Sequence, residues 1–287
     1  MTIFEWLGLL DRWFFEYRVA AEQVATMRIL GVGVIVVYFA IQAADIIRFS
    51  SPTGMLDSKT WIKCCEKFPQ LSVYAFLPES RLLPWIVLIG LFVSGTAALV
   101  GMISWLSMPV FLVCVISTQS RVFPIMFSGG DSVVRMFLIC LVLCDSGAAF
   151  SFDVWYFGNA HERVSGWPIR VIQIYICSIY WNASYYKLFR PCWTSGHASR
   201  DSAMSGIWGR RLRITTIKNE WLSKFASRGV LLYESMAPVS FWISDMTVLT
   251  LAVGLLLHGG VWGGLRLGYF GPIMMVSLLA FSEQLFV

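Results

Sequence analysis

The chain has 287 residues, of which 57% are hydrophobic and 14% are charged, and its formal net charge is +5. A soluble domain carries roughly a quarter charged residues. The deficit extends over the whole length, which excludes a soluble domain with a single membrane anchor and predicts a multi-pass protein of the cell membrane, surrounded by the lipid bilayer. No basic face occurs outside one long segment, so nucleic-acid binding is not expected.

Residues 1–25 are predicted to form an amphipathic helix. Apolar residues recur within them at helical spacing, at Phe4, Leu7, Leu10, Phe14 and Tyr17. The same stretch is rich in charged residues and lacks both a basic start and a small-residue cleavage site, so it does not match a cleavable signal. We expect this helix to lie at the membrane surface.

Seven segments are long and apolar enough to cross a membrane, which takes about 20 residues per helix. They are residues 27–47, 82–103, 106–127, 133–152, 168–188, 238–258 and 265–285. The sequence therefore predicts an all-α, polytopic membrane helix bundle of about seven spans that forms one integral membrane domain over residues 1–287. Residues 189–237, between the fifth and sixth spans, are predicted to form a long basic loop.

Seven cysteines are scattered along the chain, and none has the spacing of a zinc or redox site, so no metal is predicted. Cys140 and Cys144, one helical turn apart in an apolar run, are expected to be buried. Cys64, Cys65 and Cys192 lie in polar segments, where a disulfide would form only if that side of the membrane is oxidising.

The stretch FSGGDSVVRMF, residues 127–137, combines a small-residue turn with a helix start. Gly129 and Gly130 expose backbone amides before the helix, which is a natural site for an anion or a carbonyl oxygen. Asp131 begins the helix and Arg135 follows one turn later, where it can pair with Asp131. A capped turn with a structural ion pair is the alternative interpretation.

The fifth predicted span carries polar residues on one face. Their spacing is four, three, four and three residues, so at 100° per residue they fall within an arc of about 80°. The members of this polar stripe are Gln173, Cys177, Tyr180, Ser184 and Lys187. Lipid cannot satisfy such groups, so the stripe is expected to face other helices or a water-filled cavity.

Lys187, at the end of the stripe, has two interpretations. Its ammonium group could extend to the lipid headgroups, as lysines at span ends often do. Alternatively, neighbouring segments enclose the amine. Because desolvation disfavours the charged form of an amine, an enclosed lysine is usable as a base near neutral pH.

Two later residues are further candidates. Glu234 precedes the sixth predicted span on the same side as Lys187, where it would serve either as part of a site or as a capping residue. His258 is isolated among apolar residues, and such a histidine is more often hydrogen-bonded inside a bundle than a ligand. The seven-span count places it at the end opposite Lys187, so it could approach only if the sixth span were shorter, shifted or broken.

These segments, in this order, resemble the HTTM domain, the membrane domain shared by vitamin K-dependent gamma-carboxylases and a set of bacterial proteins. The blocks that carry the resemblance are MRILGV, GGDSVVRMF, FSFD, RVIQIYICSIYWNASYYKLFRPCWTSGHA, YESMAP and LLLHGGVWGGLRLGYFGPIMM. In size, the chain looks closer to the SdpB-type proteins, which act in bacterial systems that mature a secreted antimicrobial peptide.

The resemblance places Lys187 where carboxylases have the lysine proposed to deprotonate reduced vitamin K, so it implies a lysine base. Together with the patterns above, it makes Lys187, Asp131 and His258 the candidate catalytic residues. The candidate substrate-binding residues are Arg135, Gln173, Tyr180, Tyr186, Trp193, Glu234, Gly129 and Gly130. It also suggests a reduced quinone as cofactor, and a small secreted peptide and a companion membrane or extracytoplasmic protein as partners.

The expected function is maturation or modification of a small secreted peptide. Two departures from the carboxylases weigh on it: no large C-terminal soluble domain follows the last span, and no cofactor-specific signature is present. A non-enzymatic accessory, export or immunity protein that binds a peptide is the alternative. The charge distribution would put the long basic segment in the cytoplasm, whereas carboxylases place it outside. We follow the resemblance, because long loops escape the charge rule.

Overall fold

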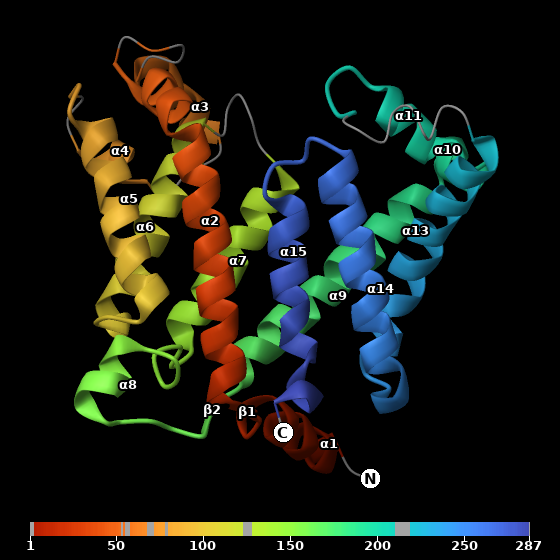
Figure 1. Cartoon of the computed structure of the whole chain (residues 1–287), viewed down its shortest axis with the longest axis horizontal. Coiled ribbons are helices and arrows are strands. Elements are labelled where there is room, and N and C mark those ends of the chain that lie inside the picture. The colour runs from red at the N-terminus through yellow and green to blue at the C-terminus, as the bar shows by residue number, and fades with distance from the viewer. Residues whose placement is uncertain are drawn as a thin grey trace. The chain divides into compact units, whose positions relative to one another are not determined.

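A computed structural model describes residues 3–286 of the chain, apart from 53, 55–57, 68–71, 78–79, 123–127 and 210–218. Nearly every regular element in these residues is a helix, so the all-α prediction is confirmed. The chain divides into two compact units, Met1–Pro168 and Ile169–Val287, each with its own internal packing (Figure 1). That the whole chain acts as one membrane domain stays a prediction.

The first unit is a set of helices with a small two-stranded sheet. Its helices are α1 (Ile3–Phe15), α2 (Ala21–Ser50), α3 (Ser58–Lys67), α4 (Val73–Phe76), α5 (Leu83–Val100), α6 (Ser104–Val122), α7 (Gly129–Leu143) and α8 (Phe152–Phe157). Strands β1 (Arg18–Ala20) and β2 (Arg163–Ser165) pair antiparallel, with Val19 opposite Val164. The sheet thereby joins the end of α1 to the segment that follows α8.

Helices α2, α5, α6 and α7 form the core of this unit, with α5 packed along both α2 and α6. Small residues set how closely they approach. A Cβ added to Gly95 would lie 2.7 Å from the side chain of Val36 on α2 and 2.8 Å from that of Phe111 on α6. Because a side chain at this position would meet both neighbours, the glycine permits three helices to converge at one level.

Four described helices are long and apolar enough to cross a membrane: α2, α5, α6 and α14 (Ser244–Gly264). They correspond to the first, second, third and sixth predicted spans. Helix α7 has 15 residues, a length of about 22 Å, which is shorter than the hydrocarbon core. Helix α9 (Trp167–Leu188) is long enough at 22 residues, but its polar stripe lowers its hydropathy. Seven spans therefore remain a prediction.

The second unit consists of helices from residue 169 onward. After α9 come α10 (Pro191–Thr194), α11 (Ala198–Met204), α13 (Glu220–Ser240), α14 and α15 (Phe270–Leu278), followed by the 3-10 turns η1 (Leu279–Phe281) and η2 (Glu283–Leu285). Helices α10 and α11 pack against α13, which also packs against α14, and α14 packs against α15. The apolar part of the last segment covers Phe270–Phe281, which is shorter than the predicted span 265–285.

The prediction of a long loop over residues 189–237 is wrong for its C-terminal part, which is helical. Helix α13 begins at Glu220 and is capped by Asn219, whose side chain accepts a hydrogen bond from the backbone amide of Leu222 at 3.1 Å. Pro238, predicted to start the sixth span, lies inside α13, and the next helix begins only at Ser244. The charged residues of the first turns made this amphipathic helix resemble a loop. Part of the predicted basic loop, residues 210–218, lies outside the described residues.

Close packing between α14 and its neighbours also differs from what the glycine spacing indicates. The GG pairs after His258 suggest a tight helix contact. A Cβ added to Gly259 would lie 3.8 Å from Met275 of α15, an ordinary contact, whereas Gly260 and Gly263 have nothing among the described residues within 4 Å of an added Cβ. The close approaches occur at Gly254, which faces Tyr233 of α13, and at Gly271, whose added Cβ would lie 2.9 Å from the backbone oxygen of His258.

Candidate functional site

The predicted polar stripe forms the buried face of α9, as expected. Gln173, Cys177, Tyr180 and Ser184 are each at most 7% exposed. The outer face carries Ile174 and Trp181, about half of whose surfaces are exposed. The stripe therefore faces neighbouring helices of the second unit rather than lipid. The isoleucines on the flanks are not uniformly outward: Ile172 and Ile176 are also buried.

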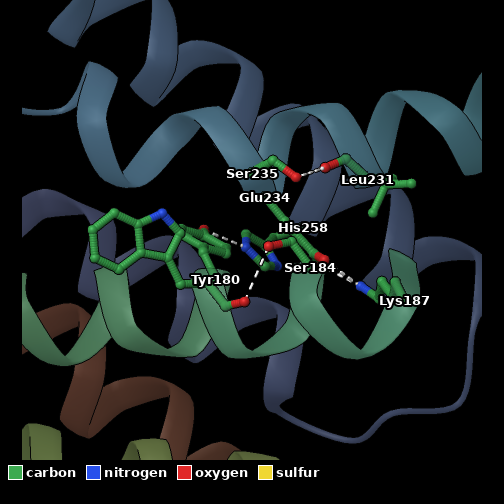
Figure 2. Close-up of polar contacts among 8 residues, drawn as sticks. Tyr180, Ser184, Lys187, Leu231, Glu234, Ser235 and His258 are labelled. Carbon is green, nitrogen blue, oxygen red and sulfur yellow. Dashed lines mark hydrogen bonds and ion pairs between the residues drawn. The ribbon is translucent and has the colours of Figure 1, made fainter. Parts of the chain in front are cut away.

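Lys187 and Glu234 form an ion pair between α9 and α13 (Figure 2). Lys187 Nζ donates to both carboxylate oxygens, at 2.5 Å from each. The indole ring of Trp193 lies beside the same nitrogen, with its centroid 4.5 Å away. A carboxylate and an aromatic face both attract a cation. The lysine side chain, 20% exposed, is therefore held by two neighbours instead of extending freely to the headgroups.

The segment after α9 folds back so that Trp193 can cover the lysine. Pro191 starts α10 soon after α9 ends, and Gly196 follows with φ of +91°, a conformation that suits glycine because it has no Cβ. The carbonyl oxygen of Gly196 accepts a hydrogen bond from Ser223 of α13 at 3.0 Å. This contact fixes the turn against α13 and positions the indole.

The two helices that carry the ion pair run antiparallel. From Cys177 to Lys187 along α9, the partners on α13 move backward from Pro238 to Glu234. Helix α9 ends one residue after Lys187, whereas α13 extends about 21 Å on the N-terminal side of Glu234. That part of α13 packs against α10 and α11 instead. The ion pair therefore lies where the α9–α13 contact ends.

A second polar contact joins α9 to α14. Tyr180 Oη lies 2.8 Å from His258 Nε2, and both side chains are almost fully buried, at 1% and 3% exposed. Tyr233 packs edge-on against Tyr180, with ring centroids 5.5 Å apart. His258 Nδ1 has no hydrogen-bond partner among the described residues. A buried polar atom without a hydrogen-bond partner destabilises the folded protein. Such atoms are therefore uncommon in native structures, and a functional role is one reason for their presence.

His258 reaches Tyr180 because the sixth helix is shifted relative to the prediction. The sequence made His258 the last residue of span 238–258, whereas it lies within α14, with Gly264 at the helix end. Tyr233 Oη donates to the backbone oxygen of Thr250 at 3.2 Å, which fixes the register of α14 against α13. The shifted-span alternative is the one that the structure adopts.

Gln173 occupies the stripe but lies far from the lysine. Its amide nitrogen donates to the backbone oxygen of Ala280 at 2.6 Å, and its amide oxygen accepts from Arg170 at 2.9 Å. Fourteen residues of helix separate it from Lys187, which corresponds to about 21 Å. Tyr180 lies between them, about 10 Å from Lys187 along the helix axis. Gln173 and Lys187 therefore cannot hold the same small group.

Tyr186 is not brought into this cluster. Its side chain is 63% exposed, and its ring packs edge-on against that of Tyr185, with centroids 5.7 Å apart. Tyr233 was the residue that sequence reasoning missed. It directly precedes Glu234, and prediction of α13 as a helix would have placed both on the surface that faces α9 and α14.

The GGD turn belongs to the first unit and forms a helix cap. Ser128 Oγ accepts from the amide of Gly130 at 3.0 Å, and the Asp131 carboxylate accepts from the amide of Ser128 at 3.0 Å. This reciprocal arrangement is a capping box. Gly129 is exposed and Gly130 is buried. The geometry corresponds to the capped-turn interpretation of Asp131.

Arg135, one turn further along α7, contacts the end of α6. Its Nε donates to Gln119 Oε1 at 2.7 Å, and its guanidinium also lies 3.4 Å from Ser120 Oγ. It therefore ties α7 to α6. A shared site for Asp131, Arg135 and Lys187, which lie in different units, stays a prediction.

The cysteines carry free thiols wherever they are described. Cys140 and Cys144 are buried, as expected. Cys64 and Cys192 are free, and the side chain of Cys65 lies outside the described residues, so a disulfide between Cys64 and Cys192 does not form in this structure.

The arrangement in the second unit is suited to moving protons. It holds two pairs of groups that can exchange protons. One is the carboxylate of Glu234 with the amine of Lys187, between α13 and α9, and the other is the phenol of Tyr180 with the imidazole of His258, between α9 and α14. Among the residues described, no group of three or more His, Cys, Asp and Glu side chains could hold a metal ion. Comparison of the chain with family models, with curated proteins and with solved structures finds no match.

Proposed function

We propose that the chain is a multi-pass protein of the bacterial cell membrane, of the HTTM-domain type and similar in size to the SdpB-type proteins, that acts in maturation or modification of a small secreted peptide. Four apolar helices of spanning length support the membrane location. The order and spacing of the sequence blocks around Lys187 support the family. A companion membrane or extracytoplasmic protein would deliver or receive the peptide.

The proposal includes seven spans and a surface helix at the N-terminus. In α1, Leu10 and Phe15 are more than half exposed, while Phe14 is half-buried and its ring lies 6.4 Å from that of Trp167. A helix with exposed apolar and charged residues, whose Phe14 ring packs near Trp167, suits the boundary between headgroups and acyl chains. The side chains of Phe4 and Leu7 lie outside the described residues.

The Lys187–Glu234 pair is the centre of the proposed activity, and its placement is the observation that carries the proposal. An ion pair at the end of a buried polar face, between two helices and under an indole ring, is a functional candidate by default in a membrane protein. Tyr180 and His258 extend the polar face toward the interior of the unit. Glu234 is the direct partner of the base, and Trp193 covers it.

Proton transfer within this pair defines the proposed mechanism. An ammonium that donates to a carboxylate has no lone pair, so Lys187 must first pass its proton to Glu234. The neutral amine then takes a proton from the substrate, which leaves as an anion, and Lys187 is an ammonium again beside a protonated Glu234. Glu234 then releases the extra proton at the partly exposed end of the α9–α13 contact, where the Lys187 side chain is 20% exposed. The substrate is a peptide, a lipid or a reduced quinone, the cofactor that the resemblance suggests.

A non-enzymatic accessory, export or immunity protein is the second candidate, and one observation favours it. The polar groups of the stripe are largely paired within the protein, as Gln173 with Ala280 and Lys187 with Glu234 show. A polar face whose members satisfy one another also serves simply to hold helices together. In that case the peptide would bind elsewhere and no bond would change.

The two candidates differ in what Glu234→Gln and Lys187→Ala do to the peptides that cells secrete. Cells expressing wild type or either variant are grown at matched protein level, and peptides in the medium are compared by mass spectrometry. The enzymatic proposal predicts that a product mass seen with wild type disappears with both variants. Lys224→Ala is the matched control, because Lys224 pairs with Glu220 at 2.8 Å on an exposed surface of α13, and it should leave the product unchanged.

An unchanged product mass and yield with both site variants would reject the enzymatic proposal in favour of the accessory role. Expression and folding are monitored by size-exclusion chromatography of the purified variants, so that loss of the protein is distinguished from loss of chemistry.

A further inference from the structure

Helix α8, in the first unit, presents an uncovered group of aromatic side chains. Trp155, Tyr156 and Phe157 are 76%, 67% and 65% exposed. Their ring contacts lie within the helix: Phe152 stacks on Tyr156 with centroids 5.9 Å apart and lies 5.3 Å from Trp155. Exposure of this much aromatic surface to water is unfavourable, so some other phase or molecule is expected to cover it.

The start of α8 is attached to the turn between α5 and α6, at one end of two membrane-length helices (Figure 1). The carboxylate of Asp153 accepts hydrogen bonds from the backbone amides of Ile103 and Ser104, both at 2.8 Å. The amide of Asp153 donates to the carbonyl oxygen of Gly101 at 3.1 Å. Three hydrogen bonds thus fix α8 at the level where α5 ends and α6 begins.

A buried arginine adds a third membrane-length helix to the same anchor. Arg28 of α2 is fully buried and donates to the backbone oxygens of Ser146 at 2.9 Å and Phe150 at 2.6 Å. Gly101, with φ of +69°, lies against this guanidinium, where a Cβ would collide with it. These hydrogen bonds therefore fix the position of α8 along the axes of α2, α5 and α6.

The surroundings of α8 change from apolar to polar within a few residues. Ile103 on the α5–α6 turn and Trp105 at the start of α6 are exposed and continue the apolar surface of the two helices. After α8 ends at Gly158, the next residues are polar and exposed, including Asn159 and Glu162. Aromatic residues between an apolar and a charged zone are typical of the boundary between acyl chains and headgroups.

We propose that α8 lies in the interfacial layer of the bilayer and that Trp155, Tyr156 and Phe157 insert into lipid there. The occupant of this surface is phospholipid, because the aromatic group is continuous with the exposed apolar surface of membrane-length helices. The inference rests on the proposed membrane location and adds an anchor that fixes the depth of the first unit.

Photo-crosslinking of the full chain tests this placement. The substitution Trp155→p-benzoylphenylalanine is introduced into protein reconstituted in vesicles of phosphatidylethanolamine and phosphatidylglycerol, and the illuminated protein is analysed by mass spectrometry. We expect a mass increase of one phospholipid. The same label at Val93, exposed on α5, reports on membrane embedding, and the label at Asn159 is the polar neighbour that should give a much lower yield. Tyr156 offers a second position on α8 if labelling at Trp155 disturbs folding.

A lipid adduct at Val93 with none at either α8 position would overturn the inference while leaving the membrane location intact. A crosslink from α8 to a second copy of the chain would also overturn it and would identify a dimer contact. If even Val93 gives no lipid adduct, the proposed membrane location fails, and the inference fails with it.

Discussion

At the scale of single residues, the Lys187–Glu234 contact makes a direct prediction about stability. Lys187→Ala leaves a carboxylate that is 9% exposed without its cation. Breaking a fully buried pair costs about 3–5 kcal/mol, and because the lysine is partly exposed we expect a smaller loss, about 2–3 kcal/mol, in thermal unfolding of detergent-solubilised protein. The double variant Lys187→Ala/Glu234→Gln should recover part of the loss.

Lys224→Ala provides the exposed comparison, and its unfolding temperature should match that of wild type. Equal unfolding temperatures for Lys187→Ala and wild type would show that the ion pair does not form or that water already surrounds it.

The Tyr180–His258 contact is tested by removal of a single oxygen. Tyr180→Phe keeps the ring but removes the partner of His258 Nε2, so that neither ring nitrogen has a hydrogen-bond partner among the described residues. A buried group that loses its hydrogen bond costs about 1–3 kcal/mol, and a double-mutant cycle with His258→Phe should give a coupling free energy of at least about 0.5 kcal/mol. Tyr185→Phe, on the exposed face of α9, should change nothing. Additivity of the two buried substitutions would contradict the contact.

The sequence predicted features that depend on the spacing of residues within one helix, and it did not predict contacts between residues of two helices. The spacing of Gln173, Tyr180 and Lys187 alone identified the buried face of α9. The partnership of Tyr180 with His258 depends on the register between α9 and α14, and that register depends on where α13 ends. No pattern within a single helix contains this information.

At the scale of helices, two glycines of α14 offer a matched pair of substitutions. In Gly254→Ala, the added methyl would collide with Tyr233 Oη and lie 2.8 Å from Leu278, so we expect a loss of about 1–3 kcal/mol in the free energy of unfolding. In Gly260→Ala, no described atom lies within 4 Å, and the better helix propensity of alanine should leave stability equal or raise it by up to about 1 kcal/mol. Thermal unfolding of both variants measures the contrast. Similar losses at both positions would mean that α14 packs through its later glycines after all.

Asp153, which caps the start of α6, predicts a dependence of stability on pH. Burial raises the pKa of Asp153, but the backbone hydrogen bonds from Ser104 and Ile103 outweigh it, so the pKa in the folded protein lies below its ordinary value. A depressed pKa stabilises the fold above the unfolded-state pKa of about 3.9, and this contribution is lost as pH falls through the folded-state pKa.

The two carboxylate oxygens of Asp153 accept from the amides of Ile103 and Ser104, whereas an asparagine side chain has one acceptor oxygen. Asp153→Asn should therefore be less stable than wild type at pH 7, by about 1 kcal/mol for the lost hydrogen bond, and this difference in stability should narrow as the pH falls toward 3. Unfolding temperatures of the two proteins across this range provide the measurement. If the difference in unfolding temperature between the two proteins stays constant with pH, the ionised carboxylate of Asp153 does not stabilise the start of α6.

The sequence-based prediction of helices relied on long uninterrupted apolar segments, and it missed α13, whose apolar residues are interrupted by charged ones. Helix α13 begins with a capping residue, Asn219, followed by Glu220, which is a recognisable start signal. Because Glu220, Lys224 and Arg228 interrupt the apolar residues of its first half, hydropathy assigned it to a loop, and Pro238 was taken as the start of the next span. Attention to Asn219 would have recovered α13, and with it the position of Tyr233 beside Glu234.

At the scale of the whole molecule, composition alone was enough to predict an all-α protein with several membrane-length helices. The number of spans was not determined, because α7 and α15 are short and α9 is polar. Hydropathy and length do not determine whether a short or polar helix crosses the bilayer, because that depends on the helices packed around it. The polar face of α9 is both the reason that its span is ambiguous and the basis of the proposed site.

The central claim, that Lys187 accepts a proton from the substrate, is tested most directly by Lys187→Arg in cells that secrete the peptide product. Arginine keeps the positive charge and can still donate to Glu234, but it is effectively never deprotonated in proteins. The proposal predicts that the product mass disappears from the medium while the purified variant keeps the unfolding temperature of wild type. Undiminished product from a correctly folded Lys187→Arg protein would contradict it.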